Sequence, residues 1–260
     1  MTPGHVRRIG GWLLGFAAML GSPPAHSQWR VGLWSDYFSW KENTSPSVRE
    51  NGTLGRLSLD YTLPRESGLL FGYRGEIHGG AVEYQGSTLF PPMQPVTGST
   101  LYVGTVQEAQ LRWRSGMGGA RFLDLVAGLG VDVWRRSLSV SQKEDYIVGY
   151  GRLGVESEPW GGGWMAGAGV LLPFQVHENA HLTDLGFQQN PALAPEGMPS
   201  PYMRLGFRLS PPVIIRFDLE VLRLGASPAV AVTHQSLGAM GVYQPASTRI
   251  RGGIGVLVEF

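Results

Sequence analysis

The sequence predicts an all-β protein: a closed antiparallel barrel of about ten membrane-spanning strands that follows a cleaved signal peptide. Three observations lead to this fold class. Apolar and polar residues alternate with the period of two that is typical of a β-strand, the connections between alternating segments differ in length, and the first residues resemble an export signal. The 260 residues are 43% hydrophobic and 16% charged, a balance that favours a folded chain over disorder.

The predicted signal peptide occupies residues 1–27. Two arginines precede an apolar run at residues 9–20, and small residues flank His26 just before the expected cleavage at Gln28. The apolar run is shorter than the roughly 20 residues that a membrane-spanning helix needs. A signal peptide is therefore favoured over an anchor helix, and the predicted barrel domain spans residues 28–260.

The strands follow in order as segments in which one face is apolar. In residues 57–63, for example, leucine and tyrosine alternate with serine, aspartate and threonine. In residues 164–176 the alternation is expected to run unbroken to Val176 on the apolar face. The candidate strands are 29–41, 52–63, 68–86, 100–115, 119–138, 144–158, 162–178, 200–210, 212–225 and 246–260.

The connections between these segments are alternately short and long. Short turns at one end and longer loops at the other are typical of membrane barrels. The longest predicted loops, 179–199 and 226–245, are rich in alanine, proline and leucine, more apolar than solvated connectors need to be. An even number of strands places both chain ends on the side of the short turns.

The sense of the alternation distinguishes a membrane barrel from a soluble lipocalin-like barrel or a sandwich. One face of each strand is almost uniformly apolar, while the other carries charges that need water or one another. An apolar exterior facing lipid and a charged interior satisfy both faces. The predicted interior charges are Arg56, Asp60, Arg74, Glu76, Glu108, Arg112, Asp124, Asp132, Arg152, Arg204, Arg208, Arg216, Asp218, Glu220, Arg249 and Arg251, together with His78.

These interior charges permit two interpretations. Because both signs are mixed, the side chains can pair across a narrow lumen and seal it. Alternatively, they can line a selective water channel for small solutes. The sealed lumen is favoured because water-filled porins have 16 or more strands.

The ending RGGIGVLVEF, with terminal Phe260, resembles the C-terminal assembly signal of bacterial outer-membrane barrel proteins. The resemblance implies a location in the bacterial outer membrane, contact with its lipid, and recognition of Phe260 by the barrel-assembly machinery. Aromatic residues near strand ends are then expected to form interfacial girdles. The candidates are Trp29, Trp34, Trp40, Tyr84, Tyr102, Trp113, Trp134, Tyr146, Trp160, Trp164 and Tyr202.

Composition excludes several kinds of chemistry. The absence of cysteine excludes disulfides, thiolate nucleophiles and cysteine-ligated metals. A net charge of +1 gives no electrostatic reason to expect nucleic acid as a partner. No motif predicts a cofactor.

Three groups of residues are candidates for catalysis or metal binding. His177 and His181 would share one face of a helix and could bind a metal with Asp184, although polar loop residues explain them better. Asp218 and Glu220 lie on one strand face beside an arginine, as in a salt-bridge ladder. His234-Gln235-Ser236 is similar in its letters to the His-x-Ser arrangement of outer-membrane lipid A deacylases.

No complete set of nucleophile, base and orienting group emerges from the sequence. The spacing of acids and histidines also departs from the rim site of the omptin proteases, which are ten-stranded barrels. The sequence therefore favours a non-enzymatic surface barrel whose external loops contact an unidentified extracellular partner or serve the structure of the envelope. A solute channel and an outer-membrane hydrolase are the alternatives.

Overall fold

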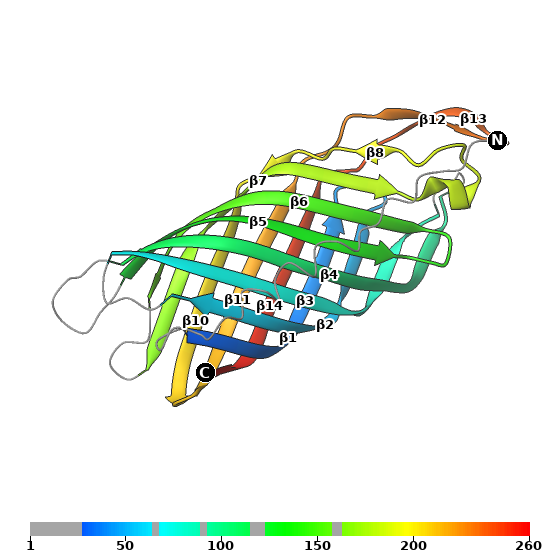
Figure 1. Cartoon of the computed structure of the whole chain (residues 1–260). Helices are drawn as coiled ribbons and strands as arrows, with labels where there is room; N and C mark the ends of the chain where they lie inside the picture. The colour runs from blue at the N-terminus through cyan, green and yellow to red at the C-terminus, as the bar shows by residue number, and fades with distance from the viewer. Residues whose placement is uncertain (1–27, 64–67, 89–92, 115–122, 158–162) are drawn as a thin grey trace, which may run out of the picture.

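The computed structural model describes residues 28–63, 68–88, 93–114, 123–157 and 163–260. Within them, ten long strands form one closed antiparallel barrel, because β1 pairs with β14 and β7 pairs with β10 (Figure 1). The predicted signal peptide lies outside the described residues. The barrel strands are β1 (Gln28–Glu42), β2 (Val48–Thr62), β3 (Gly68–Ser87), β4 (Pro95–Arg114), β5 (Leu123–Ser137), β6 (Lys143–Ser157), β7 (Trp164–Ala180), β10 (Ser200–Ser210), β11 (Val213–Leu224) and β14 (Ser247–Glu259).

Short elements occupy the two longest loops. They are the 3₁₀ turn η2 (Leu182–Leu185) and the strands β8 (Ala192–Leu193), β9 (Gly197–Met198), β12 (Val230–His234) and β13 (Gly238–Val242). The C-terminus lies at the end of the barrel opposite β12 and β13 (Figure 1). We call the end with β12 and β13 external, following the usual placement of long loops. No helix in the described segments is long and apolar enough to cross a membrane.

Two external loops are shorter than the sequence predicted. Strand β2 begins at Val48 and β4 begins at Pro95, whereas the alternation of apolar residues placed their starts at residues 52 and 100. The added strand residues, 48–51 and 95–99, carry mainly polar side chains on their outer face, so their sequence is typical of a loop. Strands of 20 residues in β3 and β4 exceed the roughly 9–11 residues that cross a bilayer, so the barrel wall extends beyond the membrane.

A β-bulge reverses the face of strand β7 near its middle. The register with β6 shifts between Gly149 and Tyr150, which pair with Gln175 and Pro173. A bulge inserts one extra residue, and proline lacks the N–H that regular pairing would need. Val176 consequently faces the interior, where it is 5% exposed, and the prediction of an unbroken outer face to Val176 is wrong.

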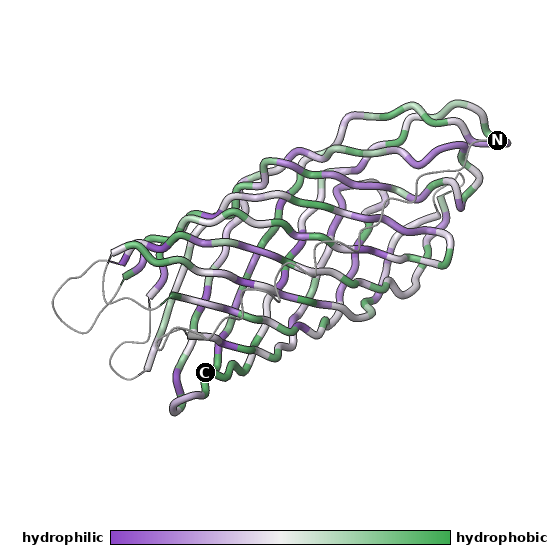
Figure 2. The backbone as a smooth tube through the Cα atoms, viewed as in Figure 1, coloured by the Kyte–Doolittle hydropathy of each residue, from purple (hydrophilic) through white to green (hydrophobic). Residues whose placement is uncertain are grey.

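The outer and inner surfaces change character along the barrel. Toward the C-terminal end the exterior is apolar, as at Leu33 and Ile254, which are 70% and 58% exposed. Figure 2 shows apolar and polar residues alternating along the strands. Toward the external end the outward positions become polar, and a cluster of buried apolar side chains fills the interior. This external cluster contains Phe38, Trp40, Leu54, Val82, Tyr102, Trp134, Tyr146, Val148, Val176, Leu222 and Leu224.

Six aromatic residues predicted at the interface lie elsewhere, four of them in this external cluster. Trp34, Trp40, Tyr102, Trp134, Tyr146 and Tyr202 lie inside the barrel, each 6% exposed or less. Trp113 and Trp164 do face outward and are 52% and 55% exposed, as interfacial aromatics should be. Trp160 lies outside the described residues. Above the membrane the wall resembles that of a soluble barrel, with aromatic side chains inside and polar ones outside.

Four interior aromatic side chains lie against a glycine on the neighbouring strand. The directly opposite pairs are Trp34 with Gly255, Trp134 with Gly104, Tyr150 with Gly130, and Tyr202 with Gly169. A Cβ added to Gly255 would lie 2.2 Å from the Trp34 ring, and one added to Gly104 would lie 2.7 Å from Trp134 Cβ. These positions require glycine because the ring occupies the space of a side chain.

One part of the wall is closed without a long strand. Strand β10 begins at Ser200, opposite Leu171, so the external half of β7 has no partner in β10. There β8 pairs with β7, and β9 pairs with the end of β11. Two short strands thus complete the barrel between β7 and β11.

Candidate functional site: the lumen and the external mouth

The structure places all sixteen predicted interior charges on the lumen face, where each takes part in an ion pair. Their positions follow from strand parity: alternate residues face inward, and a charge in the middle of a membrane strand can only face the interior. His78 also lies inside, at 5% exposure. Sequence parity therefore located these side chains, but it could not assign their partners.

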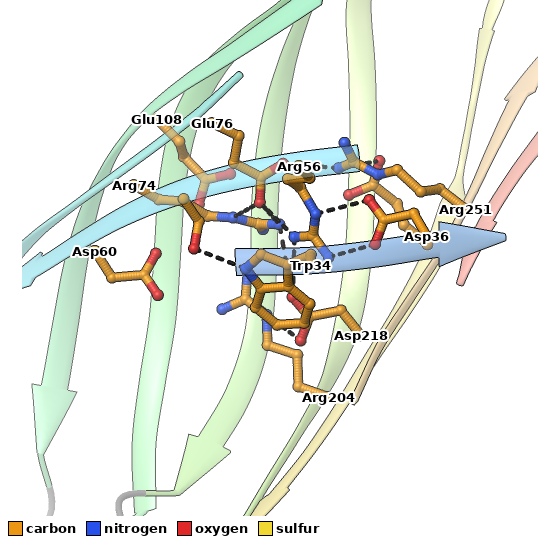
Figure 3. A network of polar contacts seen from close by, with 12 residues as sticks. Trp34, Asp36, Arg56, Asp60, Arg74, Glu76, Glu108, Arg204, Asp218 and Arg251 are labelled. Atoms are coloured by element: carbon orange, nitrogen blue, oxygen red, sulfur yellow. Dashed lines mark hydrogen bonds and ion pairs between the residues drawn. The ribbon is translucent and has the colours of Figure 1, made fainter. Parts of the chain in front are cut away.

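Arg56 is at the centre of the largest cluster (Figure 3). Its guanidinium donates two hydrogen bonds to Asp36, at 2.8 and 2.9 Å, and one to Glu76 at 2.8 Å. The guanidinium carbon lies 3.9 Å from the centroid of the Trp34 ring. Glu76 also pairs with Arg74 and, at 3.0 Å, with Arg251. Glu76 is thus compensated by arginines from three strands, β2, β3 and β14.

Asp218 joins this cluster to the C-terminal end of the lumen. Arg216 lies 3.0 Å from Asp218 and 2.8 Å from Asp60. The salt-bridge ladder predicted on β11 is therefore present at Asp218. Glu220, on the same face, lies 3.3 Å from Arg249.

The remaining pairs fill the lumen around this cluster. Arg152 lies 2.8 Å from Glu108, and Arg249 lies 2.5 Å from Asp132. Glu156 accepts hydrogen bonds of 2.9 Å from both Arg112 and Arg204. The described interior charges that sequence reasoning omitted are Arg30, Asp36, Glu42, Glu50, Arg114, Arg136, Glu144, Glu156, Glu178 and Glu259. Strand parity could have found several of them, because Asp36, Glu50 and Arg136 share the inward parity of their strands.

Little space remains between these side chains. A cavity of about 50 Å³ at the C-terminal end is lined by Arg74, Arg112 and Arg204, among others. A second cavity, of about 10 Å³, lies beside Arg56 and Arg152. A single water needs about 10–15 Å³, so these cavities hold a few waters at most.

A larger cavity opens at the external mouth. It measures about 430 Å³ and is lined by residues from several external loops, including Tyr84 and Tyr243. Arg136 lies at this cavity and pairs with Glu42, Glu50 and Glu144 at 3.0, 2.7 and 2.6 Å. Carboxylates thus outnumber arginines here, in contrast to the balanced lumen.

The two long loops form an ordered unit over this mouth, which we call the cap (residues 181–199 and 225–246). The β12–β13 hairpin packs on η2 through a cluster of Ala180, Leu182, Phe187 and Val232. Phe187 forms a β-bridge with His234. The predicted loops are therefore ordered and pack on each other.

Two histidines in this region have notable partners. Ser236 Oγ lies 3.1 Å from His234 Nδ1, and His234 Nε2 lies 3.2 Å from the carbonyl oxygen of Leu185. The same Nδ1 accepts hydrogen bonds from the backbone N–H groups of Ser236 and Leu237, at 3.2 and 3.3 Å. The imidazole therefore stabilises the turn of the hairpin.

His181 Nε2 lies 2.8 Å from Asp145 Oδ2, an Asp–His couple that sequence reasoning missed because 36 positions separate the residues. Arg135 donates to both oxygens of Asp145, at 2.6 and 2.8 Å, and compensates its charge. His177 lies on β7 rather than on a helix, so it shares no helical face with His181, and the metal-site alternative loses its geometric basis. In the described segments, no group of three or more histidines and acids could hold a metal ion.

No protein-family model and no curated protein sequence matches the chain. Solved structures do match. The outer-membrane protease OmpT from Escherichia coli superposes with a TM-score of 0.52 at 9% identity, over 91% of this chain and 97% of OmpT. Neisserial surface protein A gives 0.36 at 11% identity, over 89% and 97% of the two chains. An outer-membrane channel from Pseudomonas putida F1 gives 0.44 at 10% identity, over 92% and 97%.

The chain has the fold of a bacterial outer-membrane β-barrel. At 9% identity the likeness to OmpT concerns the fold alone. A closed barrel with an apolar belt satisfies every backbone hydrogen bond in hydrocarbon, which is the requirement for crossing a membrane with strands. The protein is accordingly an outer-membrane protein in contact with lipid.

Proposed function

We propose that the protein is a non-conducting, non-enzymatic outer-membrane barrel whose functional surface is the external cap. This proposal rests on one observation: ion pairs between residues of the barrel strands fill the lumen. The cavities beside these ion pairs measure only about 50 and 10 Å³. A hydrated ion needs a continuous water path, and charges already paired at 2.5–3.3 Å offer it none. The cap exposes Leu237 and Tyr243, at 54% and 52%, as contact groups.

Ion conductance tests this proposal against the solute channel. Wild-type protein, refolded in detergent and inserted in a planar bilayer, should give no discrete current steps. The variant Arg56→Ala/Glu76→Ala removes one charge of each sign from the centre of the lumen and should conduct, which shows that silence of the wild type is not a failure of insertion. Discrete wild-type steps that change ion selectivity in Arg251→Glu would instead establish a channel.

A hydrolase is the second candidate, favoured by the contact of 3.1 Å between Ser236 Oγ and His234 Nδ1. A serine nucleophile needs an adjacent base, and this pair supplies one. However, Nδ1 already accepts two backbone hydrogen bonds, and a carbonyl rather than a carboxylate orients the ring. We therefore expect no acyl-ester or peptide hydrolysis by the wild type. Activity on lipid A or peptide that disappears in Ser236→Ala and His234→Ala would overturn the non-enzymatic proposal.

Phe260 is proposed to serve the assembly machinery. Its side chain is 72% exposed, and its backbone N–H donates to the carbonyl oxygen of Trp29 at 2.9 Å. The terminal ring is thus presented outward at the edge where β14 meets β1.

A further inference from the structure

Three exposed cations on the outer wall differ from all the arginines of the lumen. Lys41, Arg49 and Arg223 face outward near the external end of their strands and are exposed. None of them makes an ion pair with another residue in the segments that the structure describes. In a protein that pairs its lumen charges so completely, these three unpaired cations require a separate explanation.

The strand register places the three cations side by side. Lys41 lies directly opposite Arg49 on β2 and opposite Thr248 on β14, and Thr248 lies opposite Arg223 on β11. Neighbouring strands are about 4.8 Å apart, so the row from Arg49 to Arg223 spans roughly 14 Å. We call Arg49, Lys41 and Arg223 the basic row.

The basic row is electrostatically unfavourable as it stands. Like charges directly opposite each other in an antiparallel pair destabilise a sheet, and Lys41 and Arg49 form such a pair. The chain compensates an outward cation elsewhere: Arg135 on β5 is held by Asp145, which also contacts His181. Glu83 on β3 lies opposite Asn51, two residues from Arg49, and Glu196 accepts a backbone hydrogen bond from Gly225, two residues from Arg223, but neither carboxylate pairs with the basic row in the described segments. An anion from outside the protein would relieve the repulsion.

The position of the row on the barrel identifies that anion. On β1 the outward side chains change from apolar Val31 and Leu33 to Ser35, Tyr37 and Ser39 before Lys41 is reached. Tyr37 is 56% exposed, as an aromatic residue at the membrane interface would be. The cations therefore lie beyond the apolar belt on the external side, at the depth of lipid headgroups.

We propose that the basic row binds the phosphate groups of a lipid in the outer leaflet. Arginine and lysine form charge-assisted hydrogen bonds with phosphate oxygens, and a spacing of about 5–14 Å suits a headgroup with more than one phosphate. The site depends on the outer-membrane location of the barrel, and it stands whether or not the lumen conducts.

Native mass spectrometry of the full barrel in a neutral detergent tests the proposal with bis-phosphorylated lipid A as the probe. Wild type should form a lipid adduct that the triple variant Lys41→Gln/Arg49→Gln/Arg223→Gln binds roughly a hundredfold more weakly, at about fivefold for each cation. The matched control is Arg135→Gln, an outward arginine that already has a partner, and it should bind as the wild type does. Dephosphorylated lipid A should bind no better to wild type than to the triple variant.

Several outcomes would overturn the proposal. Equal binding by the triple variant and wild type, or equal binding of lipid A and its dephosphorylated form, would exclude the basic row as a phosphate site. Displacement of the lipid by inorganic phosphate at an equal concentration of phosphate would show that the site takes the free ion. A denaturant titration checks folding: because the variant loses the repulsion between Lys41 and Arg49, it should be at least as stable as wild type.

Discussion

Replacing Arg56 by methionine should lower the free energy of unfolding by about 3–5 kcal/mol, because it leaves the Asp36 carboxylate buried without its ion-pair partner. The Arg56 side chain is 1% exposed and the carboxylates of Asp36 and Glu76 are fully buried, so water cannot replace the guanidinium. Methionine has a similar length and is apolar, so the loss reports the uncompensated carboxylate of Asp36 rather than a large cavity, while Glu76 keeps Arg74 and Arg251. Urea titration of the refolded barrel, followed by tryptophan fluorescence, measures the change.

The matched control for Arg56 is Arg135→Met on the outer wall. Arg135 also pairs with a carboxylate through two hydrogen bonds, but its side chain is 54% exposed. An exposed pair contributes about 0–1 kcal/mol. Equal losses in the two variants would show that the lumen is hydrated enough to screen its ion pairs, and would contradict the sealed interior.

Replacing Trp134 by alanine should destabilise the external half of the barrel by about 3–5 kcal/mol, the usual range for a buried tryptophan. Trp134 is 2% exposed, stacks on Tyr146 at 4.8 Å between ring centroids, and lies beneath the Arg249 guanidinium at 4.5 Å. Alanine would open a cavity and leave Arg249 without that contact. Unfolding in urea, followed through the heat-modifiable mobility of the folded barrel, gives the size of the loss.

Trp113→Ala provides the comparison for Trp134. Trp113 faces outward and is 52% exposed, so lipid or detergent fills the space that its ring leaves. We expect a clearly smaller loss than in Trp134→Ala. If Trp113→Ala were the more destabilising of the two, the aromatic side chains would stabilise the barrel mainly from the interface, as the sequence suggested, and not from within.

Much of the fold could be predicted because a membrane strand leaves few choices for a charged side chain. Arg74 and Glu76 alternate with apolar neighbours, and only the interior can accept them. The prediction was wrong at Trp40 and Trp134 because it placed aromatic residues at the interface from their position near strand ends, although Trp134 shares the inward parity of Asp132. On β7, by contrast, parity does mislead, because the bulge beside Pro173 turns Val176 inward and only the register with β6 shows it.

The sequence predicted which charged residues line the lumen, but it did not predict which of them contact one another. Strand parity placed Glu108 and Arg152 inside the barrel, yet their contact joins residues 44 positions apart. The contact of His181 with Asp145 and the row formed by Arg49, Lys41 and Arg223 depend on the register between strands in the same way. Register is set by the closed barrel as a whole, and a single segment of sequence carries little of that information.

The opposition of aromatic rings and glycines has a consequence for how the strands find this register. A slip of two residues preserves which face points inward, so hydropathy alone does not oppose it. Such a slip would bring Trp134 from Gly104 to Tyr102 or Val106, whose side chains occupy the space that the indole needs. Gly104 therefore leaves space for the Trp134 ring only in the observed register between β4 and β5. At the four strand pairs where a ring opposes a glycine, side-chain shape therefore opposes a register slip that hydropathy alone would permit.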